Sequence, residues 1–215
     1  MQVALAFILT IITSYLIGSI NTAIIVTRIV AKKDIRDMGS GNAGLTNVLR
    51  TMGKLPAFFT LIGDVLKGVI AVLIGKLLFS LIGNVGGAED LAMIGGYISG
   101  FFAMIGHVFP AYYRFKGGKG ILVSVSILLV IDPIVGIILI ALFAILVIAT
   151  KMVSVGSIAA ALSYPIVTYI LHAIKGRQNA LIEAILAGCI GAVIVFMHRH
   201  NIKRIINGTE NKLGK

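Results

Sequence analysis

The chain has little of what a soluble or disulfide-stabilised domain needs. Its 215 residues include one cysteine, four prolines and no tryptophan, and only 13% are charged, where a soluble domain carries about a quarter. The single cysteine, Cys189, excludes an intramolecular disulfide framework. The low charge leaves too few side chains to solvate the surface of an ordinary globular protein.

Apolar residues are abundant instead. They make up 58% of the chain, and the mean hydropathy is +1.04. A soluble core of this length cannot bury so much apolar surface, so the excess must face lipid. We therefore expect an all-α polytopic membrane bundle, built as a single integral-membrane domain over residues 1–215.

About seven apolar stretches approach the length that crosses a bilayer. They cover roughly residues 3–27, 56–79, 91–110, 121–132, 134–150, 154–173 and 181–197. The first lacks a basic leader and a small-residue cleavage site, which indicates a retained span and not a signal peptide. Asp132-Pro133 divides the fourth from the fifth, because proline stops one helix and aspartate caps the next.

The charge is strongly one-sided, with 19 lysine and arginine residues against 8 acidic ones and a formal net charge of +11. Most cations lie in alternate connections, which predicts an outside N-terminus and a cytoplasmic C-terminus. Such loops attract anionic phospholipid. No aromatic interleaving or nucleic-acid motif accompanies the charge, so we expect no nucleic-acid partner.

The first inner loop contains the glycine pattern GSGNAG at residues 39–44. A dinucleotide fingerprint must follow a buried strand, whereas a polar loop precedes these glycines, and no Walker pattern is present. Closely spaced glycines still let backbone N–H groups approach an oxyanion. A flexible loop with a few helix caps is the alternative, but the density of neighbouring donors favours an anion site. These donors are Ser40, Asn42, Thr46 and Asn47, with Arg50 placed to grip a phosphate.

Two further segments carry polar residues at or inside the apolar stretches. Lys119 lies between glycines in GGKG, residues 117–120, and either points into a polar cavity or reaches the lipid head groups; we favour the cavity. Asp64 and Lys67 share one helix face within the second span. A buried charge in a membrane indicates a site, but a structural ion pair explains this pair equally well, so both are second-tier candidates.

The last two spans add weaker candidates. Ser154 and the second-tier Ser157 lie one turn apart near the cytoplasmic end of the sixth span, where small-residue helix packing is an equal alternative. His198 and Asn201 share one face of the basic tail, which could also be a plain interfacial helix end. The histidines lack carboxylate partners at metal-binding spacings, so we expect no metal. They are His107, His172, His198 and His200.

Four segments in this order resemble the bacterial acyl-phosphate:glycerol-3-phosphate acyltransferases of phospholipid biosynthesis. They are GSGNAGLTNVLRTMG at 39–53, GDVLKG at 63–68, GHVFP at 106–110 leading into FKGGKG at 115–120, and HRHNIKR at 198–204 leading into NGTENKL at 207–213. His200 departs from the glutamate usual in the family, and Ile121-Leu122-Val123 departs from its usual Val-Ala-Thr.

The resemblance implies a multi-pass enzyme of the bacterial cytoplasmic membrane, with its active site on the cytoplasmic side. It implies transfer of a fatty acyl group from acyl phosphate to the 1-hydroxyl of glycerol 3-phosphate, giving lysophosphatidic acid and phosphate. On matching positions it implies catalytic roles for Thr46, Asn47, Ser154, His198 and Asn201, and substrate or phosphate binding by Ser40, Asn42, Arg50 and Lys119.

The residues fit this chemistry without cofactor, metal or stable protein partner. Acyl phosphate is already activated, so direct attack by the glycerol hydroxyl needs no covalent intermediate. The proton acceptor is either His198 or an oxygen of the departing phosphate, and we favour the phosphate because His198 has no evident carboxylate to orient it. The competing interpretation is a membrane transporter of a phosphorylated solute, whose site should be accessible from both sides.

Overall fold

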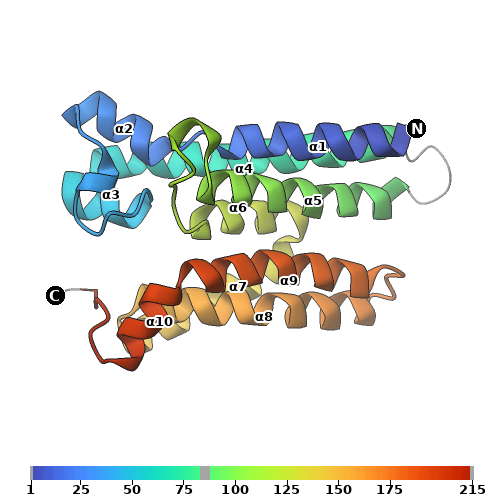
Figure 1. Cartoon of the computed structure of the whole chain (residues 1–215). Helices are drawn as coiled ribbons and strands as arrows, with labels where there is room; N and C mark the ends of the chain where they lie inside the picture. Colours follow the sequence, from blue (N-terminus) through green and yellow to red (C-terminus); the bar gives the residue numbers. More distant parts are fainter. Residues whose placement is uncertain (1, 83–87, 214–215) are drawn as a thin grey trace. The chain divides into compact units, whose positions relative to one another are not determined.

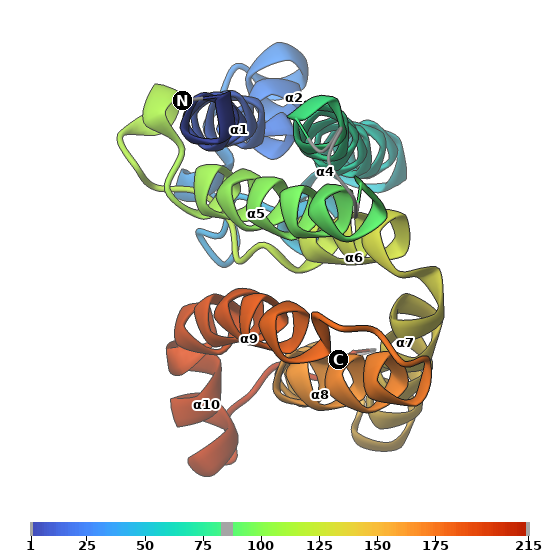
Figure 2. The ribbon, with the colours of Figure 1, turned by 90° about the vertical axis from the view of Figure 1, so that its right-hand side faces the viewer.

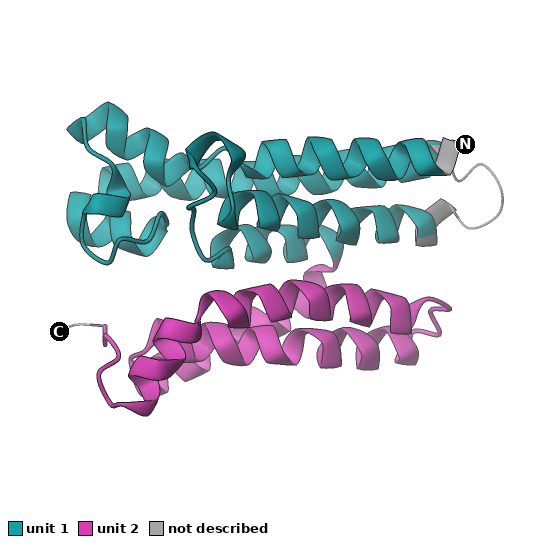
Figure 3. Ribbon diagram, in the orientation of Figure 1, with its two compact units in different colours: residues 1–131 teal, residues 132–215 magenta. Residues whose placement is uncertain are grey.

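The computed structural model describes residues 2–82 and 88–213 of the chain, and within these ranges every regular element is helical (Figure 1). The expected all-α fold is therefore confirmed. The chain forms two compact units, residues Met1–Ile131 and Asp132–Lys215 (Figure 3). The single-domain expectation stays a prediction.

Unit 1 begins with α1 (Gln2–Gly18), α2 (Thr22–Ala31), the short 3-10 helix η1 (Ile35–Asp37) and α3 (Leu45–Met52). It continues with α4 (Lys54–Ile82), α5 (Ala88–Val108), η2 (Ala111–Tyr113) and α6 (Ile121–Ile131). Unit 2 contains α7 (Pro133–Thr150), α8 (Val153–Ile174), α9 (Ala180–Met197) and α10 (Arg199–Ile206). Within the described ranges, six apolar segments are long enough to cross a membrane, and two of these are the helix pair over Ala4–Ala31 and the long α4.

The first predicted span, residues 3–27, is not one helix. The chain leaves the helical path after Gly18 and resumes at Thr22, where the Asn21 side chain caps α2 by accepting from Ile24 N at 3.2 Å. Gly18 allows the close approach that follows, because a Cβ there would lie 2.0 Å from the Ala103 carbonyl oxygen. An apolar pattern without proline hides such a break, since its cause is a cap and a tertiary contact.

The predicted break at Asp132-Pro133 is confirmed. Asp132 Oδ1 accepts from Ile134 N at 3.0 Å and from Val135 N at 3.2 Å, so it caps α7. The helix before it, α6, has only 11 residues. At 1.5 Å per residue it spans about half of a 30 Å hydrocarbon layer. The fourth predicted span, 121–132, is thus too short to count as a crossing by length, and seven crossings are not confirmed; the orientation stays a prediction.

In unit 1 the helices α1, α4 and α5 run side by side, and α6 packs against α4 and α5 (Figures 1 and 2). Glycine allows the closest approach, since a Cβ on Gly75 of α4 would lie 2.5 Å from the Gly95 carbonyl oxygen of α5. Many outward-facing side chains along these helices are apolar, for example Leu66, 51% exposed, and Leu73, 53% exposed. Such a surface fits the expected lipid environment.

Unit 2 packs α8 between α7 and α9, and a buried ionic cluster joins the three helices. His172 of α8 contacts Asp132 Oδ2 at 2.6 Å through Nε2 and contacts Glu183 of α9 through Nδ1. Arg177 donates to the other oxygen of Glu183 at 2.9 Å. Sequence spacing does not reveal this pairing of His172 with two carboxylates, because its partners lie 40 and 11 residues away.

Candidate active site

The loop after α2 is held on a small apolar core at one end of unit 1 (Figure 1). Its fully buried side chains come from α2, η1, the glycine loop and α3, and include Ile24, Ile35, Ala43 and Val48. Gly39 and Gly41 have φ values of +55° and +71°, which side chains other than glycine rarely adopt. The glycine pattern therefore forms a turn that needs glycine at two positions.

Asn47, on the inner face of α3, holds this turn together. Its Oδ1 accepts from Ser40 N at 3.0 Å, and its Nδ2 donates to the carbonyls of Ile35, Met38 and Asn42 at 3.2, 2.9 and 3.1 Å. Its side-chain amide is thus used within the protein. These contacts indicate that Asn47 shapes the loop, and its predicted role as a catalytic donor stays a prediction.

The other predicted donors of this region face outward. Ser40, Thr46 and Arg50 are exposed and Asn42 is half-buried, and Thr46 and Arg50 lie one turn apart on α3. The part of the chain that the structure describes offers no hydrogen-bond or ion-pair partner to the Arg50 guanidinium or the hydroxyls of Ser40 and Thr46. These side chains can therefore bind an anion without breaking an internal contact.

The second loop folds back onto the first. Gly117 N and Gly118 N donate to the carbonyls of Val108 and His107 at 3.0 and 3.2 Å, which returns the chain along the end of α5. A Cβ on Gly118 would lie 2.6 Å from the Ala43 carbonyl oxygen. Lys119 follows directly and is half-buried. The two glycine-rich loops, separated in sequence by α3, α4 and α5, thus lie against each other.

Arg36 fastens this arrangement. Its Nη1 donates to the carbonyls of Tyr113 and Lys116 in the second loop at 2.8 and 3.1 Å. Its Nε and Nη2 donate to Asp34 at 2.9 and 2.8 Å, and Arg28 donates to the same carboxylate at 2.8 Å. The hydrogen bonds from Arg36 hold the pKa of Asp34 well below its usual range. The Asp34 carboxylate that pairs with Arg36 and Arg28 is therefore ionised at any physiological pH.

The second-tier pair Asp64 and Lys67 forms an ion pair of 2.8 Å, buried within unit 1. Lys67 also contacts His107 Nδ1 at 2.8 Å and donates to the Ile20 carbonyl at 2.9 Å, at the break between α1 and α2. The structural ion pair envisaged from the sequence is present, and it extends to the helix end that carries the second loop.

In unit 2, Glu210 gathers two of the predicted site residues. Its Oε1 accepts from Ser154 Oγ at 2.8 Å and from Asn201 Nδ2 at 2.6 Å, while its Oε2 accepts from Arg204 Nε at 2.7 Å. Burial alone would raise the pKa of the Glu210 carboxyl, but these hydrogen bonds outweigh burial and lower the pKa. Glu210 was not predicted as a site residue, although its segment carried the family resemblance.

Each of the remaining two candidates of unit 2 has a contact with a carbonyl one helical turn before it. His198 is buried, and its Nδ1 lies 2.7 Å from the Ile194 carbonyl oxygen, so Nδ1 carries a proton and the neutral ring has its lone pair on Nε2. This carbonyl is the orienting group that the sequence did not reveal. The buried Ser157 donates to the Val153 carbonyl of its own helix at 2.9 Å, which favours the packing interpretation.

Comparison with known proteins agrees with these features over the whole chain. The sequence model of a family described as glycerol-3-phosphate acyltransferase matches residues 8–208. The chain belongs to the glycerol-3-phosphate acyltransferase family. The protein of that name from Thermoanaerobacter pseudethanolicus is 42% identical over 97% of this chain and 96% of its own length. Its counterpart from Clostridioides difficile is 39% identical over 98% and 97%.

Solved structures of the family extend the agreement to the fold. The crystal structure of PlsY, an integral membrane glycerol 3-phosphate acyltransferase, in its glycerol 3-phosphate form matches with a TM-score of 0.77 and 30% identity over 97% of this chain and 96% of that one. Its lysophosphatidic acid form matches with a TM-score of 0.76 and 29% identity over 97% and 95%. The chain is thus a multi-pass integral membrane protein of an acyltransferase family.

Asn47 offers a direct test of how this acyltransferase builds its first loop. Replacing it with aspartate keeps the shape but removes the donors to three carbonyls and sets a negative charge against them. We expect the loop to lose about 1–3 kcal/mol of local stability, with faster amide exchange over residues 38–44. Hydrogen exchange measured by mass spectrometry checks this, and Thr51→Val on the same helix is the control. Unchanged exchange in the variant would remove Asn47 from this role.

Proposed function

We propose that the chain transfers a fatty acyl group from acyl phosphate to the 1-hydroxyl of glycerol 3-phosphate. A bond forms between the glycerol oxygen and the acyl carbon, the bond from that carbon to the phosphate oxygen breaks, and lysophosphatidic acid and phosphate leave. Both substrates are anionic, and the donor is lipid-tailed. The related PlsY is described in glycerol 3-phosphate and lysophosphatidic acid forms, which supports both the acceptor and the product.

The observation that carries this proposal is the meeting of the two glycine-rich loops in unit 1. Arg36 and the Gly118–Ala43 contact hold the loops together, and the outward side chains beside them are donors. Arg50 can bind a phosphate bidentately, and Lys119 supplies a point charge. Ser40, Asn42 and Thr46 add neutral donors. Two phosphate-bearing substrates need this combination.

The chemistry proceeds in one step, because acyl phosphate needs no covalent activation. Orientation and oxyanion stabilisation then carry most of the rate. Thr46 and Asn201 are the proposed donors, and Ser154, whose hydroxyl proton goes to Glu210, is a proposed orienting acceptor. The departing phosphate takes the proton, since it is attached to the bond that breaks. His198 is the competing acceptor through Nε2. A His198→Gln variant should keep the shape of the pH–rate profile, and loss of the low-pH limb, where a general base becomes protonated, would assign the proton to His198.

The same proposal places the reaction at the cytoplasmic face of the bacterial cytoplasmic membrane, following the basic excess of alternate loops. The decisive experiment uses purified protein in detergent with palmitoyl phosphate and glycerol 3-phosphate, followed by phosphate release and product mass. Lysophosphatidic acid should form in the absence of any compartment, and palmitoyl-CoA should not replace the donor. A preparation that makes no product but carries glycerol 3-phosphate into liposomes would instead be a transporter.

A further inference from the structure

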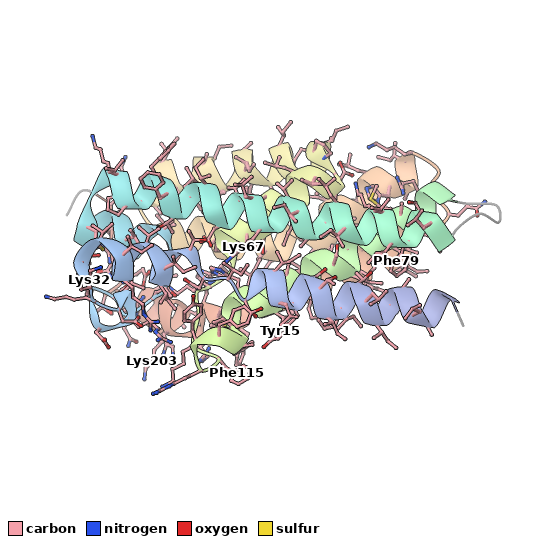
Figure 4. The ribbon with its side chains drawn as sticks, turned by 90° about the horizontal axis from the view of Figure 1, so that it is seen from above. Tyr15, Lys32, Lys67, Phe79, Phe115 and Lys203 are labelled. Carbon is pink, nitrogen blue, oxygen red and sulfur yellow. The ribbon has the colours of Figure 1, made fainter. Side chains whose placement is uncertain are left out.

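A buried ionic network lies behind the two loops of unit 1. The Lys67 ammonium contacts Asp64 Oδ1 at 2.8 Å, His107 Nδ1 at 2.8 Å and the Ile20 carbonyl at 2.9 Å. The ammonium is thus paired with Asp64 by charge and bonded to His107 and to the Ile20 carbonyl. The three side chains are at most 4% exposed. Figure 4 shows Lys67 reaching from α4 toward the place where α1 ends and α2 begins.

The network reaches the second loop through His107. The carbonyl of His107 accepts from Gly118 N at 3.2 Å, and a Cβ on Gly118 would lie 2.2 Å from His107 Nε2. Because the Lys67 ammonium donates to Nδ1, the neutral ring carries its proton on Nε2. Gly118 therefore lies against the edge of the His107 ring, and Lys67 orients that ring. Because Lys119 follows Gly118 directly, this contact helps to set the position of Lys119.

The network also reaches the first loop. The Ile20 carbonyl lies in the interruption between α1 and α2, where helical partners are missing, and Lys67 satisfies it. The next residue, Asn21, caps α2 and extends its amide toward the Ala43 carbonyl at 3.5 Å. Lys67 thus supports both sides of the contact between Ala43 and Gly118.

We propose that Asp64, Lys67 and His107 are positioning residues that hold Lys119 in its phosphate-binding place. The proposal rests on the proposed function, in which Lys119 binds a substrate phosphate. The plain alternative is an ion pair that only packs α4 against its neighbours. The positioning role and the packing role predict different activities. An ion pair that only packs helices can be replaced by neutral residues of similar volume without loss of activity.

The test removes both charges together in the full-length protein, with Asp64→Asn and Lys67→Met. We expect an apparent Tm close to that of the wild type and a kcat/KM reduced about ten- to hundredfold. Adding Lys119→Ala should then lower kcat/KM clearly less than it does in the wild type, because the lysine has already lost its place. Lys76→Met is the matched control, since Lys76 also lies on α4 and donates to a carbonyl, that of Val130 at 2.8 Å.

Normal kcat/KM in the double variant, or a Lys119→Ala effect of the same size in both backgrounds, would overturn the proposal. If the double variant does not fold, His107→Asn and His107→Leu replace it. Asparagine keeps a polar atom near Nδ1, so it should retain more activity than leucine, and equal loss in both overturns the role of the contact. If the wild type is inactive with acyl phosphate, the proposed function is refuted instead. The affinity for glycerol 3-phosphate, measured by calorimetry, then replaces kcat/KM in the comparison of the same variants.

Discussion

Replacing Arg50 with alanine is expected to lower kcat/KM for acyl transfer about ten- to hundredfold. Its guanidinium is exposed, lies one turn from Thr46 and is bound to no other described residue, so it can serve a substrate phosphate. Loss of one charge-assisted phosphate contact costs about 1.5–3 kcal/mol, which corresponds to that range. Initial rates with acyl phosphate and glycerol 3-phosphate, each varied in turn, show which substrate loses affinity.

Two further variants distinguish a specific contact between Arg50 and a substrate phosphate from a general effect of positive charge. Arg50→Lys keeps the charge but not the planar fork, so it should recover only part of the loss. Lys54→Ala removes an exposed cation four residues along the chain, at the start of α4, and should leave kcat/KM within about twofold because exposed charges are screened. Equal effects of Arg50→Ala and Lys54→Ala would show that only the summed charge matters.

The sequence predicts the helices well because their signal is local. Runs of apolar residues must satisfy backbone hydrogen bonds within themselves in lipid, so they form helices wherever they occur. Asp132 and Pro133 end one helix and begin the next through their own geometry. The break after Gly18 is missed because it depends on Ala103, on another helix.

The candidate site is predictable as a set of residue types but not as a set of contacts. Glycines, arginine and neutral donors in one short loop indicate an anion site from composition alone. That Asn47 uses its amide on three backbone carbonyls is visible only once the loop is folded. The bond from Ser154 to Glu210 joins residues 56 apart, and no spacing rule links them. Side-chain pairing over such separations follows from tertiary packing.

Glu210 carries the second large expected effect. Its carboxylate holds Ser154, Asn201 and Arg204, so Glu210→Ala removes the group that positions two proposed site residues. We expect kcat/KM to fall about tenfold or more, since each charge-assisted hydrogen bond contributes about 1.5–3 kcal/mol. Glu210→Gln keeps an oxygen for Ser154 and Asn201 and loses the ion pair, so it should lose less. Equal activity of all three proteins would remove Glu210 from the site.

The same carboxylate predicts a pH dependence of stability. The folded pKa of Glu210 lies below its ordinary value of 4.5, so the ionised form stabilises the fold above that pH. This contribution disappears as pH falls from about 4.5 through the folded pKa. Asp34, whose pKa is also lowered, titrates in the same acid range and must be separated.

The difference in apparent Tm between wild type and Glu210→Gln, measured at each pH, makes that separation. It should be largest near neutral pH and shrink toward acid pH, because the wild-type carboxyl becomes neutral like the amide while Asp34 contributes equally to both proteins. A difference that stays constant over the acid range would mean that the Glu210 carboxylate does not gain from its three donors. Ser154 and Asn201 would then be held by packing, and the activity loss in Glu210→Ala would need another cause.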